Sequence, residues 1–144
     1  MNRKFDPKKL YKDFVEKNKD TINKYSSDPE KMKELVQQAD EKAEKNEGYL
    51  RGAVGKVTLL ASLLKAYKRG EYRQVSRTSI FMVIVTLLYF VTPFDAWPDF
   101  LPLGYVDDLA LLGYTIRTIN EELITFKAWK EKNDQDTADA ENSQ

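Results

Sequence analysis

The sequence predicts an all-α protein, in which charged N-terminal helices precede a basic amphipathic helix and an apolar helix–turn–helix hairpin. Three observations favour this fold class. Helical patterns begin at Asp6-Pro7 and Asp28-Pro29, since Asp caps a helix and Pro fits its first position. Apolar residues then recur three and four positions apart. Finally, an uncharged run of 17 residues, 78–94, is too long for an ordinary buried strand.

The first third of the chain is highly charged. After Asp28-Pro29, apolar residues form a thin stripe on a helix that otherwise carries mainly Glu and Lys: Met32, Val36, Ala39 and Ala43. Such a helix is stable only when its stripe packs against another element. Gly48 and Gly52 then interrupt the pattern and indicate a hinge. We therefore expect residues 1–52 to form a charged helical arm.

A basic amphipathic helix is expected from about residue 53 to 69. Its apolar side consists of Val54, Val57, Leu60, Leu64 and Tyr67. Gly70 follows at the position where a left-handed residue commonly ends a helix. This helix opens a second region, which we expect to extend over residues 53–132. At 144 residues, the chain has the length of one ordinary domain and can bury a fair core.

The uncharged segment 78–94 has apolar residues on all sides of its helix, so every face must be removed from water. Ser76 is placed to cap its N-terminus, and Pro93 ends it. Two structures satisfy this requirement. A helix of this length spans about 25 Å, which is the lower limit for a transmembrane helix. Alternatively, the segment is the central helix of a soluble bundle, covered by the helices on either side.

The last helix is expected to open at Asp107 or Asp108, after a turn rich in Pro and Asp. Its apolar residues follow a heptad-like seam typical of helix packing: Leu109, Leu112, Ile116, Ile119, Leu123 and Phe126. The charges that follow residue 116 make it a poor second membrane span. Residues 133–144 have no large apolar side chain and are expected to form a disordered acidic tail.

The net charge of zero conceals two halves of opposite charge. Residues 1–77 hold 19 basic and 12 acidic residues, a net +7, whereas residues 78–144 hold 4 and 11, a net −7. Five cations lie just before the apolar segment: Lys65, Lys68, Arg69, Arg73 and Arg77. They suit an anionic lipid surface and would keep the N-terminus of a membrane protein in the cytoplasm. Residues 1–9 carry no signal-peptide pattern, and the cytoplasm is the alternative location.

The segment from Leu87 to Leu112 resembles the YkvA-type domain of unknown function, a bacterial family. The resemblance rests on the spacing of eight residues: Pro93, Asp95, Pro98, Asp99, Pro102, Gly104, Asp107 and Asp108. Thr92 stands where the family usually has Ser, and one residue is missing between Pro102 and Gly104. Similarity extends over about residues 53–132. The resemblance implies a membrane-associated protein whose two apolar helices form a membrane hairpin, and it assigns no activity.

The chain contains no Cys and no His, which excludes thiol nucleophiles, disulfides, imidazole-based triads and Cys or His metal sites. Four carboxylates in the turn are candidate ligands for Mg²⁺ or Ca²⁺: Asp95, Asp99, Asp107 and Asp108. Their spacing matches no EF-hand loop. We favour a turn-building role, in which Asp side chains bond free backbone N–H groups and Asp107 or Asp108 caps the last helix. We expect no enzyme and no cofactor.

Two further kinds of site are rejected. Gly52, Gly55 and Lys56 do not make a phosphate loop, because no Ser or Thr follows Lys56. The lysines of the first half are interleaved with Asp and Glu, so no nucleic-acid partner is expected.

The function predicted from the sequence is that of a small, non-catalytic, membrane-associated helical protein that contacts anionic lipids. One alternative is a soluble helical domain that binds a protein partner, or a second copy of itself, through its last helix or its N-terminal arm. A carboxylate-based divalent-cation site is the remaining alternative.

Overall fold

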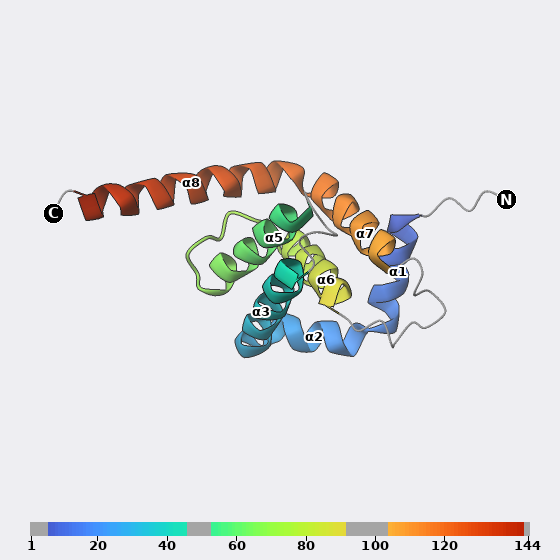
Figure 1. The fold of residues 1–144 in the computed structure, drawn as a ribbon. Coiled ribbons are helices and arrows are strands. Elements are labelled where there is room, and N and C mark those ends of the chain that lie inside the picture. Colours follow the sequence, from blue (N-terminus) through green and yellow to red (C-terminus); the bar gives the residue numbers. More distant parts are fainter. Residues whose placement is uncertain (1–5, 46–52, 92–103, 143–144) are drawn as a thin grey trace.

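The computed structural model describes residues 6–45, 53–91 and 104–142, and in the last range it places the side chains of residues 110–134. The described residues form helices and no strand, which confirms the all-α fold class. The helices are α1 (Pro7–Lys17), α2 (Lys19–Ser27), α3 (Pro29–Lys45), α5 (Ala53–Lys68), α6 (Arg77–Val91), α7 (Gly104–Thr118) and α8 (Asn120–Asn142) (Figure 1).

The predicted helix starts in the N-terminal segment are confirmed. The Asp6 side chain accepts a hydrogen bond from the backbone N–H of Lys8 at 3.1 Å, and the Asp28 side chain accepts one from the N–H of Glu30 at 2.9 Å. Between these caps, Asn18 separates α1 from α2, and its side-chain amide donates to the carbonyl oxygen four residues earlier at 2.9 Å. The side chain thereby satisfies a carbonyl at the end of α1.

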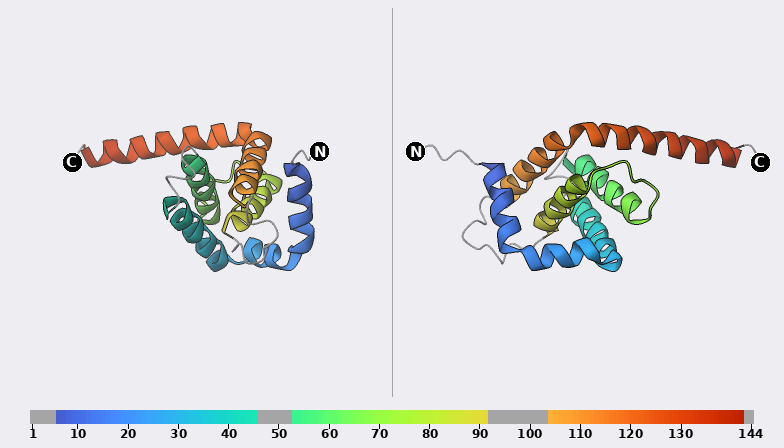
Figure 2. Two further views of the ribbon diagram at one scale, coloured as in Figure 1. Left: turned by 45° about the vertical axis from the view of Figure 1, so that its right-hand side comes forward. Right: turned by 180° about the vertical axis from the view of Figure 1, so that it is seen from behind.

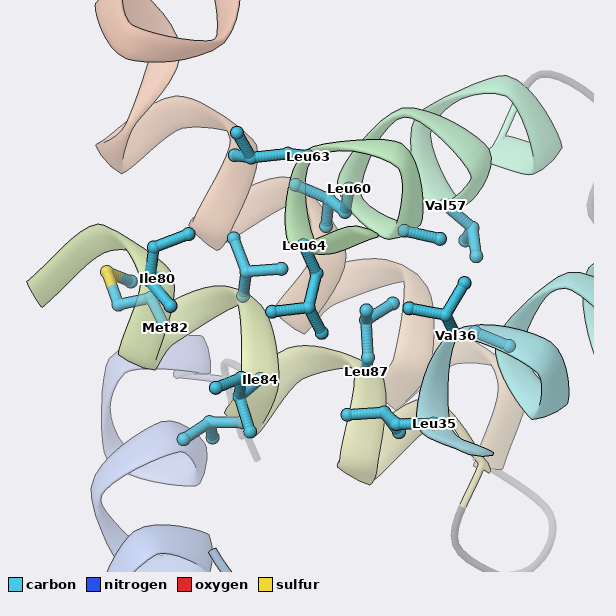
Figure 3. Close-up of a cluster of buried hydrophobic side chains, with 14 of the residues drawn as sticks. Leu35, Val36, Val57, Leu60, Leu63, Leu64, Ile80, Met82, Ile84 and Leu87 are labelled. Carbon is cyan, nitrogen blue, oxygen red and sulfur yellow. The ribbon is translucent and has the colours of Figure 1, made fainter. Parts of the chain in front are cut away.

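Helix α6 lies at the centre of the fold and contacts α1, α2, α3, α5 and α7. Figure 2 shows it between α3 and α5 on one side and α1 and α7 on the other. Ten of its residues are buried, and side chains from α3, α5 and α6 converge in the core (Figure 3). Most side chains of α6, the described part of the apolar segment, are therefore removed from water by the helices around it.

Helices α1, α2 and α3 share the core of the remaining helices. Phe14, Ile22 and Leu35 are buried in one cluster that also contains side chains of α5, α6, α7 and α8. The stripe predicted on α3 is buried at three of its four positions, and Leu35 is a core residue that the stripe missed. The hinge glycines Gly48 and Gly52 lie outside the described residues, so the division of the chain at residue 52 stays a prediction.

The predicted last helix is two helices, α7 and α8, which meet at Ile119. Four residues of the predicted seam are buried: Leu112, Ile119, Leu123 and Phe126. The expectation of a disordered tail is wrong for residues 133–142, because α8 continues to Asn142 and extends beyond the other helices (Figure 1). Gln135, Ala138, Ala140 and Glu141 favour this extension, whereas the Asp, Asn and Thr residues around them do not. An ion pair between Lys130 and Asp134, one turn apart at 3.4 Å, adds to it.

A buried hydrogen bond joins α6 to α7. The hydroxyl oxygens of Thr86 and Thr115 are 2.5 Å apart, and both residues are buried. We expect Thr86→Val to lower the free energy of unfolding by about 1–3 kcal/mol, because it leaves the Thr115 hydroxyl buried without its partner. The double variant with Thr115→Val should be closer to the wild type, since both polar groups are gone. Urea denaturation measures all three proteins, and a double variant less stable than Thr86→Val would contradict the prediction.

A tyrosine pair between α1 and α7 is expected to make the stability of the fold sensitive to alkaline pH. Tyr11 lies beside Tyr114, with ring centroids 6.1 Å apart. Burial, reinforced by Tyr114, raises the pKa of Tyr11 to about 12. Because the folded state holds this proton more tightly than the unfolded state, the associated stability is complete below about pH 10 and is lost as the pH rises toward 12. The urea midpoint should fall over this range, and it should fall less in Tyr11→Phe.

Candidate functional site

Most of the turn motif lies outside the described residues, namely Pro93, Asp95, Pro98, Asp99 and Pro102. Gly104 is the first residue of α7. Asp107 and Asp108 therefore lie inside that helix, at its fourth and fifth positions. The prediction that one of them is the N-cap is wrong, because the helix begins before both.

Within the ranges that the structure describes, no three carboxylates are grouped so that they could hold a metal ion. The Asp turn is only partly within those ranges, and its role as a divalent-cation site stays a prediction. Isothermal titration of Mg²⁺ and Ca²⁺ into the purified chain tests it directly.

The five predicted lipid-contacting cations lie along residues 65–77, which we call the basic connection: the end of α5, the loop to α6 and the first residue of α6. Gly70 has the positive φ of 78° that ends α5 in a left-handed residue, as predicted. The N–H of Gly70 donates to the Tyr67 carbonyl oxygen, and the N–H of Glu71 donates to that of Ala66, both at 3.0 Å. This pattern closes a helix C-terminus and directs the chain away from its axis.

The other end of the basic connection is also held by hydrogen bonds. The Ser76 side chain accepts from the N–H of Ser79 at 3.1 Å, which confirms the predicted cap of α6. Its hydroxyl also lies 2.9 Å from the Ser79 hydroxyl oxygen. The loop that carries the cations is therefore anchored where each helix meets it.

The middle of the basic connection is fixed by an aromatic cluster that sequence reasoning missed. Tyr72 is only 3% exposed, and its ring centroid lies 5.1 Å from that of Phe126 and 5.0 Å from that of Trp129. The last two rings stack at 5.8 Å. We call Tyr72, Phe126 and Trp129 the aromatic cluster. The signal available in the sequence was an aromatic residue, Tyr72, between two charged residues, Glu71 and Arg73.

The five cations have different surroundings. Lys65 lies near Asp40 of α3: burial raises the pKa of Asp40, and the Lys65 ammonium lowers it. The Arg73 guanidinium lies 4.5 Å from the centroid of the Tyr67 ring, a cation–π distance. Lys68 is half-buried, whereas Arg69 and Arg77 are exposed. The cations share one continuous segment of the chain, and Lys65 differs from the others because it interacts electrostatically with Asp40.

The prediction of a transmembrane helix is wrong for the described residues, because no helix among them has the length and apolar character to cross a bilayer. Helix α6 has 15 residues, so it is about 22 Å long, shorter than the roughly 30 Å hydrocarbon core. Tyr89, near its end, packs edge-on against Phe14 of α1 at 5.2 Å. The orientation with the N-terminus in the cytoplasm stays a prediction.

Lys42 of α3 is a second residue that sequence reasoning missed. Its ammonium group donates to the Phe90 carbonyl oxygen at the end of α6 and lies 4.9 Å from the Phe90 ring centroid. A cation at this position stabilises the negative end of the helix dipole. In the sequence, Lys42 is one of several lysines on a charged helix, and no local signal distinguishes it.

We expect Lys42→Met to lower the free energy of unfolding by about 1–2 kcal/mol, since hydrogen bonds to charged groups contribute about 1.5–3 kcal/mol and Met retains much of the aliphatic contact. Lys45→Met, an exposed change on the same helix, is the matched control and should be nearly neutral. Thermal unfolding compares the two. Equal effects would argue against a specific role for Lys42.

One family model and one curated relative match this chain, and the family model covers most of α6 and the residues that follow it. The family described as "Protein of unknown function (DUF1232)" matches residues 79–114. The "Uncharacterized membrane protein YkvA" of Bacillus subtilis (strain 168) is 31% identical over 75 residues, which are 51% of this chain and 71% of that protein. No solved structure matches the chain.

Proposed function

This chain belongs to the YkvA-type family of proteins of unknown function, DUF1232, and on that premise we propose that it is a small non-catalytic helical protein that associates with anionic membrane surfaces. The observation that carries the proposal is the basic connection. Five cations and a single carboxylate, Glu71, occur between residues 65 and 77. A relative called a membrane protein supports a lipid surface as the partner.

Arg77 is the most informative of these cations. It is the first residue of α6, whose first turn contains no acidic residue. Because the N-terminus of a helix carries partial positive charge, a cation there is unfavourable for the helix itself. Lys68 and Arg69, by contrast, lie at the negative end of α5, where folding alone accounts for them. Helix stability does not explain a cation at this position, whereas a negatively charged lipid phosphate beside Arg77 would explain it.

The proposed association is electrostatic and lies at the membrane surface. The apolar side chains of α6 are buried against other helices, so lipid contact falls to the exposed basic connection. Each Lys or Arg near an anionic leaflet contributes about 1 kcal/mol. Binding through a few such cations is therefore weak, reversible and reduced by salt.

Flotation with lipid vesicles tests this function. The full chain should float with vesicles that contain phosphatidylglycerol at low salt, but not at high salt or with phosphatidylcholine alone. Lys68→Gln, Arg69→Gln and Arg77→Gln together should abolish flotation, since each lost cation weakens binding about fivefold. Lys12→Gln, Lys24→Gln and Lys33→Gln, three exposed changes elsewhere, form the control. Absence of the wild type from the floated fraction, or equal loss in both triple variants, would refute the proposal.

A second candidate function is binding of a protein partner, or of another copy of the chain, through α8. The observation that favours it is Ile124, which is 60% exposed on this helix, and α8 extends beyond the body (Figure 1). Sedimentation velocity of the wild type and of Ile124→Ser tests self-association. A concentration-dependent dimer that Ile124→Ser removes would support this function, and a monomer at all concentrations would exclude the second copy.

A further inference from the structure

The basic connection is held to a distant part of the chain at its midpoint. Tyr72 lies between Glu71 and Arg73, which are both exposed, yet it is itself 3% exposed. Its contacts are the α8 rings Phe126 and Trp129, at 5.1 and 5.0 Å. The backbone on either side of Tyr72 is thereby fixed relative to α8.

The cations on either side of Tyr72 are consequently carried on a constrained segment. Gly70 closes α5 on one side, and the Ser76 cap begins α6 on the other. The guanidinium carbon of Arg73 lies over the Tyr67 ring, 4.5 Å from its centroid. Ligand binding to groups that are already ordered loses less conformational entropy than binding to mobile ones.

The rings, and not the tyrosine hydroxyl, make this attachment. The Tyr72 hydroxyl oxygen and one carboxylate oxygen of Glu122 on α8 are buried, and neither has a hydrogen-bond partner among the described residues. Burial raises the pKa of Tyr72, and the Glu122 charge raises it further, so the hydroxyl stays protonated at neutral pH. Tyr72→Phe therefore keeps the attachment and removes only an unpartnered group.

We infer that Tyr72 and Trp129 are positioning residues for lipid binding: the aromatic cluster holds the basic connection against α8, so that its arginines meet the headgroup phosphates as a preformed surface. This inference rests on the proposed function. It makes α8 part of the membrane-binding unit, although α8 itself need not touch lipid. Guanidinium groups suit this role because their planar donors match phosphate oxygens.

The test combines hydrogen exchange with flotation on phosphatidylglycerol-containing vesicles, using the full chain. Trp129→Ala should speed amide exchange at residues 69–76, leave the amides of α6 protected and weaken vesicle binding at least threefold. Tyr72→Leu should do the same, and because Tyr72 is buried its effect cannot come from lost lipid contact. Tyr72→Phe should bind and exchange like the wild type.

The two hypotheses fail in different ways. A wild type that does not bind anionic vesicles refutes the proposed function, and the inference with it. A wild type that binds, together with Trp129→Ala and Tyr72→Leu proteins that bind equally well, overturns the inference alone. Faster exchange throughout α6 in both variants also overturns it, because the cluster would then act on global stability and not on the basic connection.

Discussion

Leu87→Ala is expected to lower the free energy of unfolding by about 2–5 kcal/mol. Leu87 lies on α6, is 0% exposed and is seen near Leu35 and Val36 of α3 in Figure 3. The change removes buried apolar atoms and leaves a cavity that the closely packed helices around α6 can close only in part. Urea denaturation in the absence of detergent, followed by circular dichroism, measures the loss.

Ile124→Ala is the matched control for this experiment. Ile124 is a similar aliphatic residue on α8, but it is 60% exposed. Its replacement should change the stability by no more than about 0.5 kcal/mol. Similar losses in the two variants would contradict the burial of α6 by the other helices.

The burial of α6 shows where sequence reasoning about this fold reaches its limit. Its apolar residues on every side correctly predicted a helix removed from water, but the same pattern fits a bilayer and a protein core. The side chains that surround α6 in the structure come in part from the charged N-terminal helices, whose sequence does not indicate this contact. Phe14, Ile22 and Leu35 complete the core, although each lies tens of residues before α6 in the sequence.

Local features were predictable because their causes are local. The caps at Asp6, Asp28 and Ser76, and the helix end at Gly70, depend on a residue and the backbone a few positions away. The same reasoning failed for Asp107, because α7 begins at Gly104 and the residue before it in the sequence, Leu103, is not of a capping type.

The charges of the candidate site could be predicted from the sequence, but the contacts that hold the charged segment in place could not. The five cations of the basic connection are evident as a cluster in the sequence, whereas the electrostatic influence of Lys65 on Asp40 requires α3 to lie beside α5. Tyr72 gains its role from rings more than fifty positions later in the chain. Lys42 likewise meets a carbonyl oxygen 48 residues away. Contacts between such distant residues are set by the packing of helices, which periodicity does not specify.

Phe126→Ala is expected to have the other large effect, a loss of about 3–5 kcal/mol in the free energy of unfolding. Phe126 is 1% exposed and belongs both to the main core and to the aromatic cluster. Its loss should therefore weaken the packing of α8 on the body and the attachment of the basic connection together. Thr125→Ala, an exposed change at the neighbouring position, should leave the stability nearly unchanged.

A double-mutant cycle between Phe126→Ala and Tyr72→Leu separates these two contributions. Edge-to-face ring pairs add about 0.5–1.5 kcal/mol beyond their buried area, and the rings of Phe126 and Tyr72 meet at 66°. The double variant should thus be more stable than the sum of the single losses predicts, by an amount in this range. Strict additivity would mean that the Phe126 and Tyr72 rings do not stabilise each other. The attachment of the basic connection to α8 would then depend on the contact between Tyr72 and Trp129, whose ring centroids are 5.0 Å apart.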